Sequence, residues 1–299
     1  MNGYHIPVLL KESVDGLKIS PGGTYVDVTF GGGGHSAEIL QRLDKGRLYA
    51  FDQDADAIKN LPGNNKLTFT QGNFKFLSNY LKYYGVEYID GLLADLGVSS
   101  HHFNNPDRGF TYRTDAPLDM RMNRNSRLTA EVIINDYDEE KLSRVLHEYG
   151  ELFQARKLAA AIVKARQNQR IETVMQLISS IETLIPKQSE NQFLSKVFQA
   201  LRIEVNRELE NLEEMLVSAA GLLNTGGRLV VISYHSLEDR LVKNFMRWGN
   251  VKEQPEKDLY GNSNPPFINI TRKPVTASED EISANPRARS ARLRIAEKK

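Results

Sequence analysis

The chain has 299 residues, which is long for one compact domain and sufficient for one domain with a large insertion. Apolar residues make up 40% and charged residues 26%, so the composition excludes a disordered chain. The 39 basic and 38 acidic side chains nearly cancel, which excludes a uniformly basic surface and permits a local basic patch. Without cysteine, disulfides and zinc–thiolate sites are impossible. No apolar run reaches the ~18 residues of a membrane span, and the first residues lack a signal-peptide pattern, so we expect a cytoplasmic protein.

Strand and helix signals alternate over the first hundred residues. Strands are expected at 24–30, 47–51, 67–70 and 88–96. Helices are expected between them, over 36–43, 55–61 and 74–84. This order predicts a doubly wound parallel sheet with right-handed crossovers.

The next expected strand, 228–233, lies far beyond the dozen or so residues that a crossover needs. Asp138 and Thr173 are typical helix caps, and one apolar stripe from Phe198 to Leu223 predicts a single long helix that returns the chain to the sheet. A further helix is expected over 237–248. Two late strands, expected over 267–273 and 291–296, complete a seven-stranded sheet. We therefore predict that the α/β domain has two parts, at 1–105 and 206–299. An inserted helical subdomain is predicted between them, at 106–205.

A glycine cluster, Gly31–Gly34, stands where the first strand passes into a helix, and Asp52 ends the second strand. This combination is typical of a nucleotide site, in which the backbone approaches the ligand and the acid binds a ribose. No Gly-Lys-[Ser/Thr] follows, which excludes a P-loop, and Ser36 stands where a dinucleotide fingerprint has its third glycine. The pattern favours S-adenosylmethionine (SAM) over NAD and leaves NAD open.

Asp95 ends the fourth strand at the predicted switch point of the sheet, where it could orient an amine or accept its proton. Tyr234 and His235 follow the fifth strand on the same edge and form a further candidate wall. The neighbouring His101 and His102 lack a third ligand, so no metal site is expected.

Six stretches of this sequence resemble the MraW family of ribosomal RNA methyltransferases. They follow one another in the family's order and span nearly the whole chain. The stretches are Val26-Asp-Val-Thr-Phe-Gly-Gly-Gly-Gly-His-Ser36, Gly91-Leu-Leu-Ala-Asp-Leu-Gly-Val-Ser-Ser100, Arg108-Gly-Phe110 with Pro117-Leu-Asp-Met-Arg121, Phe198-Gln-Ala-Leu-Arg-Ile203, Tyr234-His-Ser-Leu-Glu-Asp239 and Asn285-Pro-Arg-Ala-Arg-Ser290.

The resemblance implies SAM-dependent methylation of the N4 amine of a cytidine in the decoding region of small-subunit (16S) ribosomal RNA, within an assembled or nearly assembled 30S subunit. It implies a seven-stranded Rossmann-like methyltransferase sheet with an inserted helical domain. The family's SAM contacts fall on Gly33, Gly34, His35, Asp52, Phe74, Asp95 and His102, the last at a position where the family commonly has glutamine. A homodimer and a non-catalytic ribosome-assembly factor stay open.

Catalytic and RNA-binding residues follow from the chemistry of that reaction. Asp95 or an adjacent backbone carbonyl is the candidate acceptor for the N4 proton, and Tyr234 or His235 is expected to contact the flipped base. Basic and aromatic residues in three segments are expected to contact RNA. They are Arg108, Phe110 and Arg121 beyond the fourth strand, Arg202 on the long helix, and Arg287 and Arg289 near the C-terminus.

Overall fold

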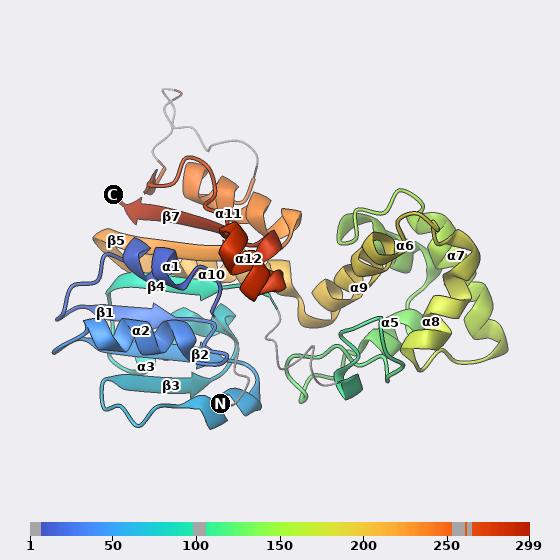
Figure 1. Cartoon of the computed structure of the whole chain (residues 1–299), viewed down its shortest axis with the longest axis horizontal. Coiled ribbons are helices and arrows are strands. Elements are labelled where there is room, and N and C mark those ends of the chain that lie inside the picture. The colour runs from blue at the N-terminus through green and yellow to red at the C-terminus, as the bar shows by residue number, and fades with distance from the viewer. Residues whose placement is uncertain (1–6, 98–105, 253–260, 262–264) are drawn as a thin grey trace. The chain divides into compact units, whose positions relative to one another are not determined.

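Seven strands form one sheet in the order β3-β2-β1-β4-β5-β7-β6 (Figure 1). The computed structural model describes residues 7–97, 106–252, 261 and 265–299. Strands β1 to β5 are parallel, and β7 pairs antiparallel with both β5 and β6. The strands are β1 (Thr24–Asp27), β2 (Arg47–Asp52), β3 (Leu67–Gln71), β4 (Ile89–Asp95), β5 (Leu223–Ser233), β6 (Phe267–Asn269) and β7 (Arg292–Lys298). The predicted α/β fold with five parallel strands and a closing antiparallel pair is confirmed.

The chain divides into two compact units. The first comprises Met1–Gly97 and Leu209–Lys299 and contains the sheet, and the second comprises Val98–Glu208. The sequence predicts 106–205 for this inserted part. The order reverses between β1 and β4, the place where ligands bind at the carboxyl ends of strands in open α/β sheets.

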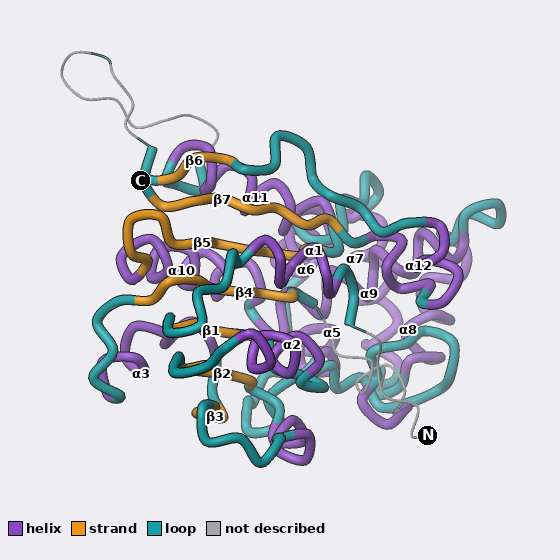
Figure 2. The backbone as a smooth tube through the Cα atoms, turned by 60° about the vertical axis from the view of Figure 1, so that its left-hand side comes forward, coloured by secondary structure: helices purple, strands orange, loops and turns teal. Residues whose placement is uncertain are grey.

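Helices cover both faces of the sheet in the first unit (Figures 1 and 2). Along β4, Leu93 packs in one core cluster with residues of α1 and α2, whereas Leu92 and Ala94 pack in another with residues of α3, α10 and α11. This alternation follows from the two-residue period of a strand. The helices are α1 (Leu10–Gly16), α2 (Gly34–Arg42), α3 (Leu77–Tyr83), α10 (Glu208–Leu222), α11 (Ser236–Trp248) and α12 (Glu279–Ala284), with short 3₁₀ turns at Ala55–Asn60, Phe74–Phe76 and Pro286–Ser290.

The prediction of one continuous helix from Phe198 to Leu223 is wrong. Helix α9 (Glu190–Asn206) ends at Arg207, whose φ of 50° lies in the left-handed region, and α10 begins at the next residue. Leu223 is already the first residue of β5, paired with Ile89 before a register shift. The apolar stripe continues across the break because each helix buries its apolar face in the core of its own unit.

The second unit is helical around its own core. That core includes Leu146, Leu158, Leu177 and Leu201. Its helices are α5 (Ala130–Asp136), α6 (Glu139–Glu148), α7 (Ala155–Asn168), α8 (Val174–Ile181) and α9, with 3₁₀ turns at Pro106–Arg108 and Glu182–Leu184.

Two predicted caps shape these helices. Asp138 accepts the Lys141 N–H at 2.7 Å at the start of α6. Thr173 and Gln176 form a reciprocal capping box at the start of α8. Both caps are confirmed, so the sequence locates these two helix starts.

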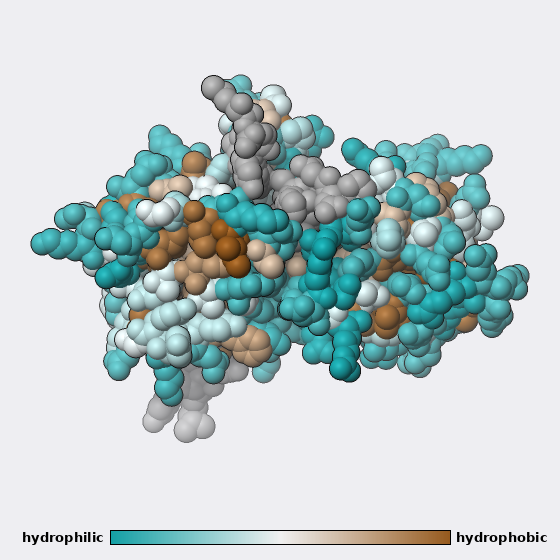
Figure 3. Space-filling view, turned by 90° about the horizontal axis from the view of Figure 1, so that it is seen from below, coloured by the Kyte–Doolittle hydropathy of each residue, from teal (hydrophilic) through white to brown (hydrophobic). Residues whose placement is uncertain are grey.

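Among the described residues, no helix is both long and apolar enough to cross a bilayer. Hydrophilic side chains cover most of the face seen in Figure 3.

Candidate active site

The turn after β1 requires glycine at two adjacent positions. Gly33 has a φ of 78°, and a Cβ there would lie 2.9 Å from the Phe30 ring. A Cβ at Gly34 would overlap the ring of Pro7. The backbone of this turn is therefore held close to its surroundings. Helix α2 begins at Gly34 without a side-chain cap, and the first N–H groups of a helix have no partner within the helix.

Asp52 closes the opposite side of the glycine turn from the end of β2. Its Oδ2 accepts the Gly31 N–H at 2.7 Å, and its Oδ1 accepts the Asp54 N–H at 2.8 Å. Burial raises the pKa of Asp52 to about 6, although both hydrogen bonds favour the charged form. Each carboxylate oxygen keeps a further lone pair, so the group can still accept a hydroxyl donor such as a ribose.

Asp27, which the sequence analysis did not single out, fixes the start of the same turn. Its carboxylate is buried and accepts the Ser36 hydroxyl at 2.6 Å and the Thr29 N–H at 3.0 Å. Burial raises its pKa. The signal that could have identified Asp27 is an acid at the end of a buried strand beside a glycine cluster, because such a group must find hydrogen-bond donors.

Asp95 lies at the end of β4, beside β1, and its surroundings orient it tightly. Its N–H donates to the Thr29 hydroxyl at 2.6 Å, the Tyr234 hydroxyl donates to its Oδ1 at 2.7 Å, and the His35 Nδ1 lies 3.9 Å from its Oδ2. Burial raises the pKa of Asp95 to about 6, against the opposing effects of His35 and Tyr234. An acid of this pKa near neutral pH can accept a proton in a reaction.

Tyr234 contacts Asp95, whereas His235 caps a helix. Burial and the neighbouring Asp95 charge raise the Tyr234 pKa well above its ordinary value, so the hydroxyl stays a donor. His235 is the N-cap of α11, where its Nδ1 accepts the Glu238 N–H at 3.4 Å and its Nε2 lies 3.2 Å from the Glu238 carboxylate. Base contact by His235 stays a prediction.

Phe74 and the histidine pair complete the predicted cofactor set. Phe74 begins a 3₁₀ turn capped by Asn73, whose side-chain amide donates to Gln53 at 3.0 Å. Gln53 directly follows Asp52, so Phe74 stands on the same edge of the sheet. The predicted contact at His102 and the neighbouring His101 lie outside the described residues.

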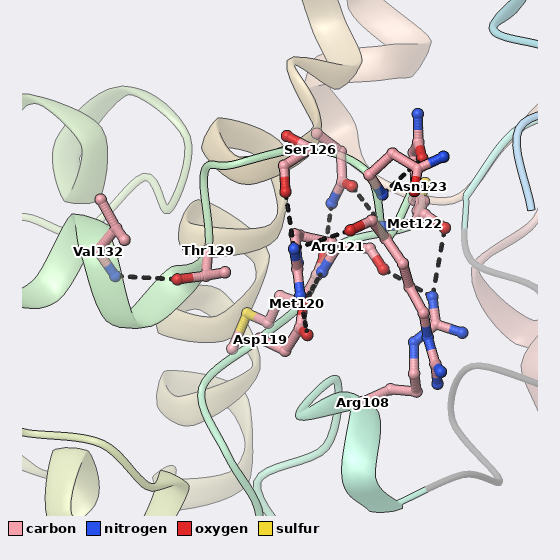
Figure 4. A network of polar contacts seen from close by, with 12 residues as sticks. Arg108, Asp119, Met120, Arg121, Met122, Asn123, Ser126, Thr129 and Val132 are labelled. Atoms are coloured by element: carbon pink, nitrogen blue, oxygen red, sulfur yellow. Dashed lines mark hydrogen bonds and ion pairs between the residues drawn. The ribbon is translucent and has the colours of Figure 1, made fainter.

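Two of the predicted RNA-binding residues are held within the second unit (Figure 4). The Arg108 side chain is buried, and it donates to the Arg121 carbonyl at 2.7 Å. Arg121 pairs with Asp119 through two N–H groups at 2.7 and 2.8 Å and donates to the Ser126 carbonyl. Both guanidinium groups therefore organise this loop, which argues against direct RNA contact by the buried Arg108.

The remaining predicted RNA contacts differ in exposure. Phe110 is buried in the core of the second unit, which argues against stacking on a base, and Arg202 pairs with Glu208 through two bonds of 2.9 Å. On the 3₁₀ turn after α12, Arg287 is half-buried and Arg289 is exposed. Of the residues predicted to bind RNA, these two arginines belong to the first unit.

Comparison with known proteins identifies the family. The model of the MraW methylase family matches residues 2–299. The chain belongs to this family. It is 55% identical over 297 residues to the ribosomal RNA small subunit methyltransferase H of Phocaeicola vulgatus, covering 99% of this chain and 98% of that protein. The corresponding protein of Bacteroides fragilis is 56% identical with the same coverage.

A solved rRNA methylase from Streptococcus thermophilus is 13% identical and superposes with a TM-score of 0.43, covering 99% of each chain. The order and the directions of the seven strands define the fold.

The cofactor of this MraW methylase is SAM, and the residues present fit it. The glycine turn brings backbone close to a ligand without requiring phosphate contacts, and Asp52 offers carboxylate lone pairs beside it. Residues that would hold the cofactor are Gly33, Gly34, Asp52, Phe74 and Asp95. The His35 imidazole faces the Val8 carbonyl and Asp95, so its own contribution to such a site would come from its backbone.

Proposed function

We propose that this MraW methylase transfers a methyl group from SAM to the N4 amine of a cytidine in 16S ribosomal RNA. The observation that carries the proposal is Asp95, a buried carboxyl at the switch point with a pKa of about 6 and a fixed orientation. Family membership over residues 2–299, and the name ribosomal RNA small subunit methyltransferase H borne by its relatives, support the choice of substrate.

The amine of cytosine is a poor nucleophile because its lone pair is delocalised into the ring. The chain must therefore orient the amine and accept a hydrogen bond from it as the nitrogen becomes tetrahedral. SAM supplies an electrophilic methyl group on a sulfonium, which is already a good leaving group. Asp95 is the proposed acceptor, held by the Thr29 hydroxyl through its N–H and by the Tyr234 hydroxyl through Oδ1.

RNA contact is proposed for the end of the chain in the first unit. Arg289 is exposed on the 3₁₀ turn at Pro286–Ser290 and suits phosphate binding. Arg287 lies close enough to Tyr234 for its guanidinium to interact electrostatically with that side chain, although burial lowers the pKa of this guanidinium. Arg287 is therefore proposed to bind a phosphate next to the base that Tyr234 contacts, in an assembled or nearly assembled 30S subunit of the cytoplasm.

Nucleoside mass spectrometry tests this function. Purified protein and labelled SAM are incubated with unmodified small ribosomal subunits, with naked 16S RNA and transfer RNA in parallel. We expect N4-methylcytidine in the subunit sample and none in transfer RNA. A methyl group on carbon or ribose, or no transfer despite SAM binding, would overturn the proposal.

A further inference from the structure

The His35 ring lies beside Asp95, and each of its two nitrogens faces an oxygen atom of the protein. Its Nε2 lies 3.1 Å from the Val8 carbonyl oxygen, and its ring is 7% exposed. A carbonyl oxygen only accepts hydrogen bonds, so Nε2 must carry the hydrogen. The Val8 carbonyl thereby selects one tautomer of the imidazole.

The other nitrogen, Nδ1, faces Oδ2 of Asp95 at 3.9 Å. If only Nε2 carries a hydrogen, the neutral ring directs the lone pair of Nδ1 at a lone pair of the Asp95 carboxylate. The two lone pairs repel each other unless one of the two groups carries a proton. At this distance the interaction is between charges rather than a hydrogen bond. A proton on Nδ1 makes an imidazolium that stabilises the ionised Asp95, which is itself only 16% exposed.

The segment that provides the Val8 carbonyl is fixed on both sides. Pro7 packs against Gly34 at the start of α2, and the Leu9 N–H donates to Glu281 of α12 at 2.7 Å. This segment therefore cannot slide along the ring without breaking the contact to α12. The carbonyl is a built partner of His35 rather than an incidental neighbour.

The other charged and titratable groups near the pair do not replace His35. Asp27 and Glu238 raise the pKa of Asp95 through their negative charges, whereas Tyr234 lowers it by donating a hydrogen bond. Glu281 and Arg287 interact with Tyr234, whose hydroxyl donates to Asp95. Among the described groups that act on Asp95, His35 supplies the positive charge.

We propose that the His35 side chain is a positioning residue for the methyl transfer, which keeps Asp95 ionised and ready to accept the proton of the substrate amine. This role rests on the proposed function. The nitrogen that gains the methyl carbon loses one N–H proton, and the bonding pair of that N–H stays on nitrogen. The proton passes to Asp95, which becomes the neutral acid, and the electron pair of the broken carbon–sulfur bond stays on sulfur.

The discriminating variant is His35→Gln, whose amide still donates to the Val8 carbonyl but cannot carry the charge. The matched control is His147→Gln, which changes an exposed histidine of α6 in the second unit. We expect His35→Gln to raise the titration midpoint of the Asp95 carboxyl by at least about one pH unit, read by carbon NMR on the protein without RNA or SAM. The acidic limb of methyl transfer should move upward by the same amount, while His147→Gln leaves both unchanged.

A purely structural role for His35 would lower activity equally at every pH and leave the carboxyl titration in place. That result would overturn the proposal. Nitrogen NMR of the wild-type histidines gives a test that needs no variant, because the imidazolium and the two neutral tautomers differ in their nitrogen shifts. We expect both His35 nitrogens to carry hydrogen while Asp95 is ionised, and a neutral His35 ring beside ionised Asp95 would overturn the proposal. Both NMR measurements test the interaction between His35 and Asp95 without methyl transfer, so they remain informative if the proposed function is wrong.

Discussion

Asp95 is buried, and its burial has opposite effects on chemistry and on stability. Because its pKa is about 6, the carboxyl loses its capacity to accept a proton as the pH falls through that value. We expect the rate of methyl transfer to fall on an acidic limb with a midpoint near pH 6. A rate profile from pH 5 to pH 8.5 at saturating SAM measures it, and a flat profile across pH 6 would contradict Asp95 as the acceptor.

The same pKa predicts that Asp95 destabilises the free protein. Its folded value of about 6 exceeds the ordinary 3.8, so the folded state binds the proton more tightly than the unfolded state. The resulting loss of stability is complete above about pH 6 and disappears as the pH falls below 3.8. Asp95→Asn should therefore raise the free energy of unfolding by up to about 3 kcal/mol at pH 7.5, with a gain that shrinks toward pH 4. Urea unfolding at both pH values checks this, and a variant less stable than wild type at pH 7.5 would refute it.

Thr29 links the glycine turn to Asp95 through a single hydroxyl. This hydroxyl accepts the Asp95 N–H at 2.6 Å, so Thr29→Val leaves that N–H without its acceptor. Such a loss costs about 1–3 kcal/mol of stability. We expect Thr29→Val to be destabilised by this amount and to transfer methyl groups more slowly, whereas Thr29→Ser stays close to wild type. Thermal unfolding of the pair is the measurement, and equal behaviour of Val and Ser would contradict a role for the hydroxyl.

At the scale of elements, the glycine turn after β1 is a tightly constrained connection of the sheet. Gly33→Ala introduces a Cβ at a φ of 78° and 2.9 Å from Phe30, which should cost about 1–3 kcal/mol and weaken SAM binding. Gly63→Ala is the control, because a Cβ there meets nothing within 4 Å. Calorimetric titration with SAM and thermal unfolding read both effects. Comparable SAM affinity in the two variants would contradict a cofactor site at this turn.

Most elements could be predicted because their signals are local. The signals for the strand that begins at Thr24, for the glycines and for the caps at Asp138 and Thr173 depend on neighbouring residues alone, although this strand ends at Asp27 and not at the expected residue 30. The break at Arg207 could not be predicted, because an arginine with φ of 50° has no glycine or proline signal and the apolar spacing runs on unchanged. Only the separate cores of the two units show that the stripe belongs to two helices.

At the scale of the whole molecule, the sequence locates the site better than it assigns roles. Positions at strand ends, such as Asp52 and Asp95, follow from the order of elements. The ring directions of His35 and His235 do not, because they depend on Val8 and Glu238, partners that tertiary folding provides. The burial of Arg108 could not be predicted from the sequence either, because a charged side chain is expected at the surface.

We propose that the first unit binds SAM at the glycine turn and uses Asp95 for the chemistry. Single-turnover methyl transfer to small ribosomal subunits, compared between wild type and Asp95→Asn at saturating SAM, tests it most directly. Binding of SAM and of the subunit is measured on the same samples. We predict a rate at least about 10²-fold lower for the variant at saturating SAM, with the affinity for the subunit within a few-fold of wild type and a smaller loss of SAM affinity than of rate. Equal losses of rate and of binding, or an unchanged rate, would contradict the claim.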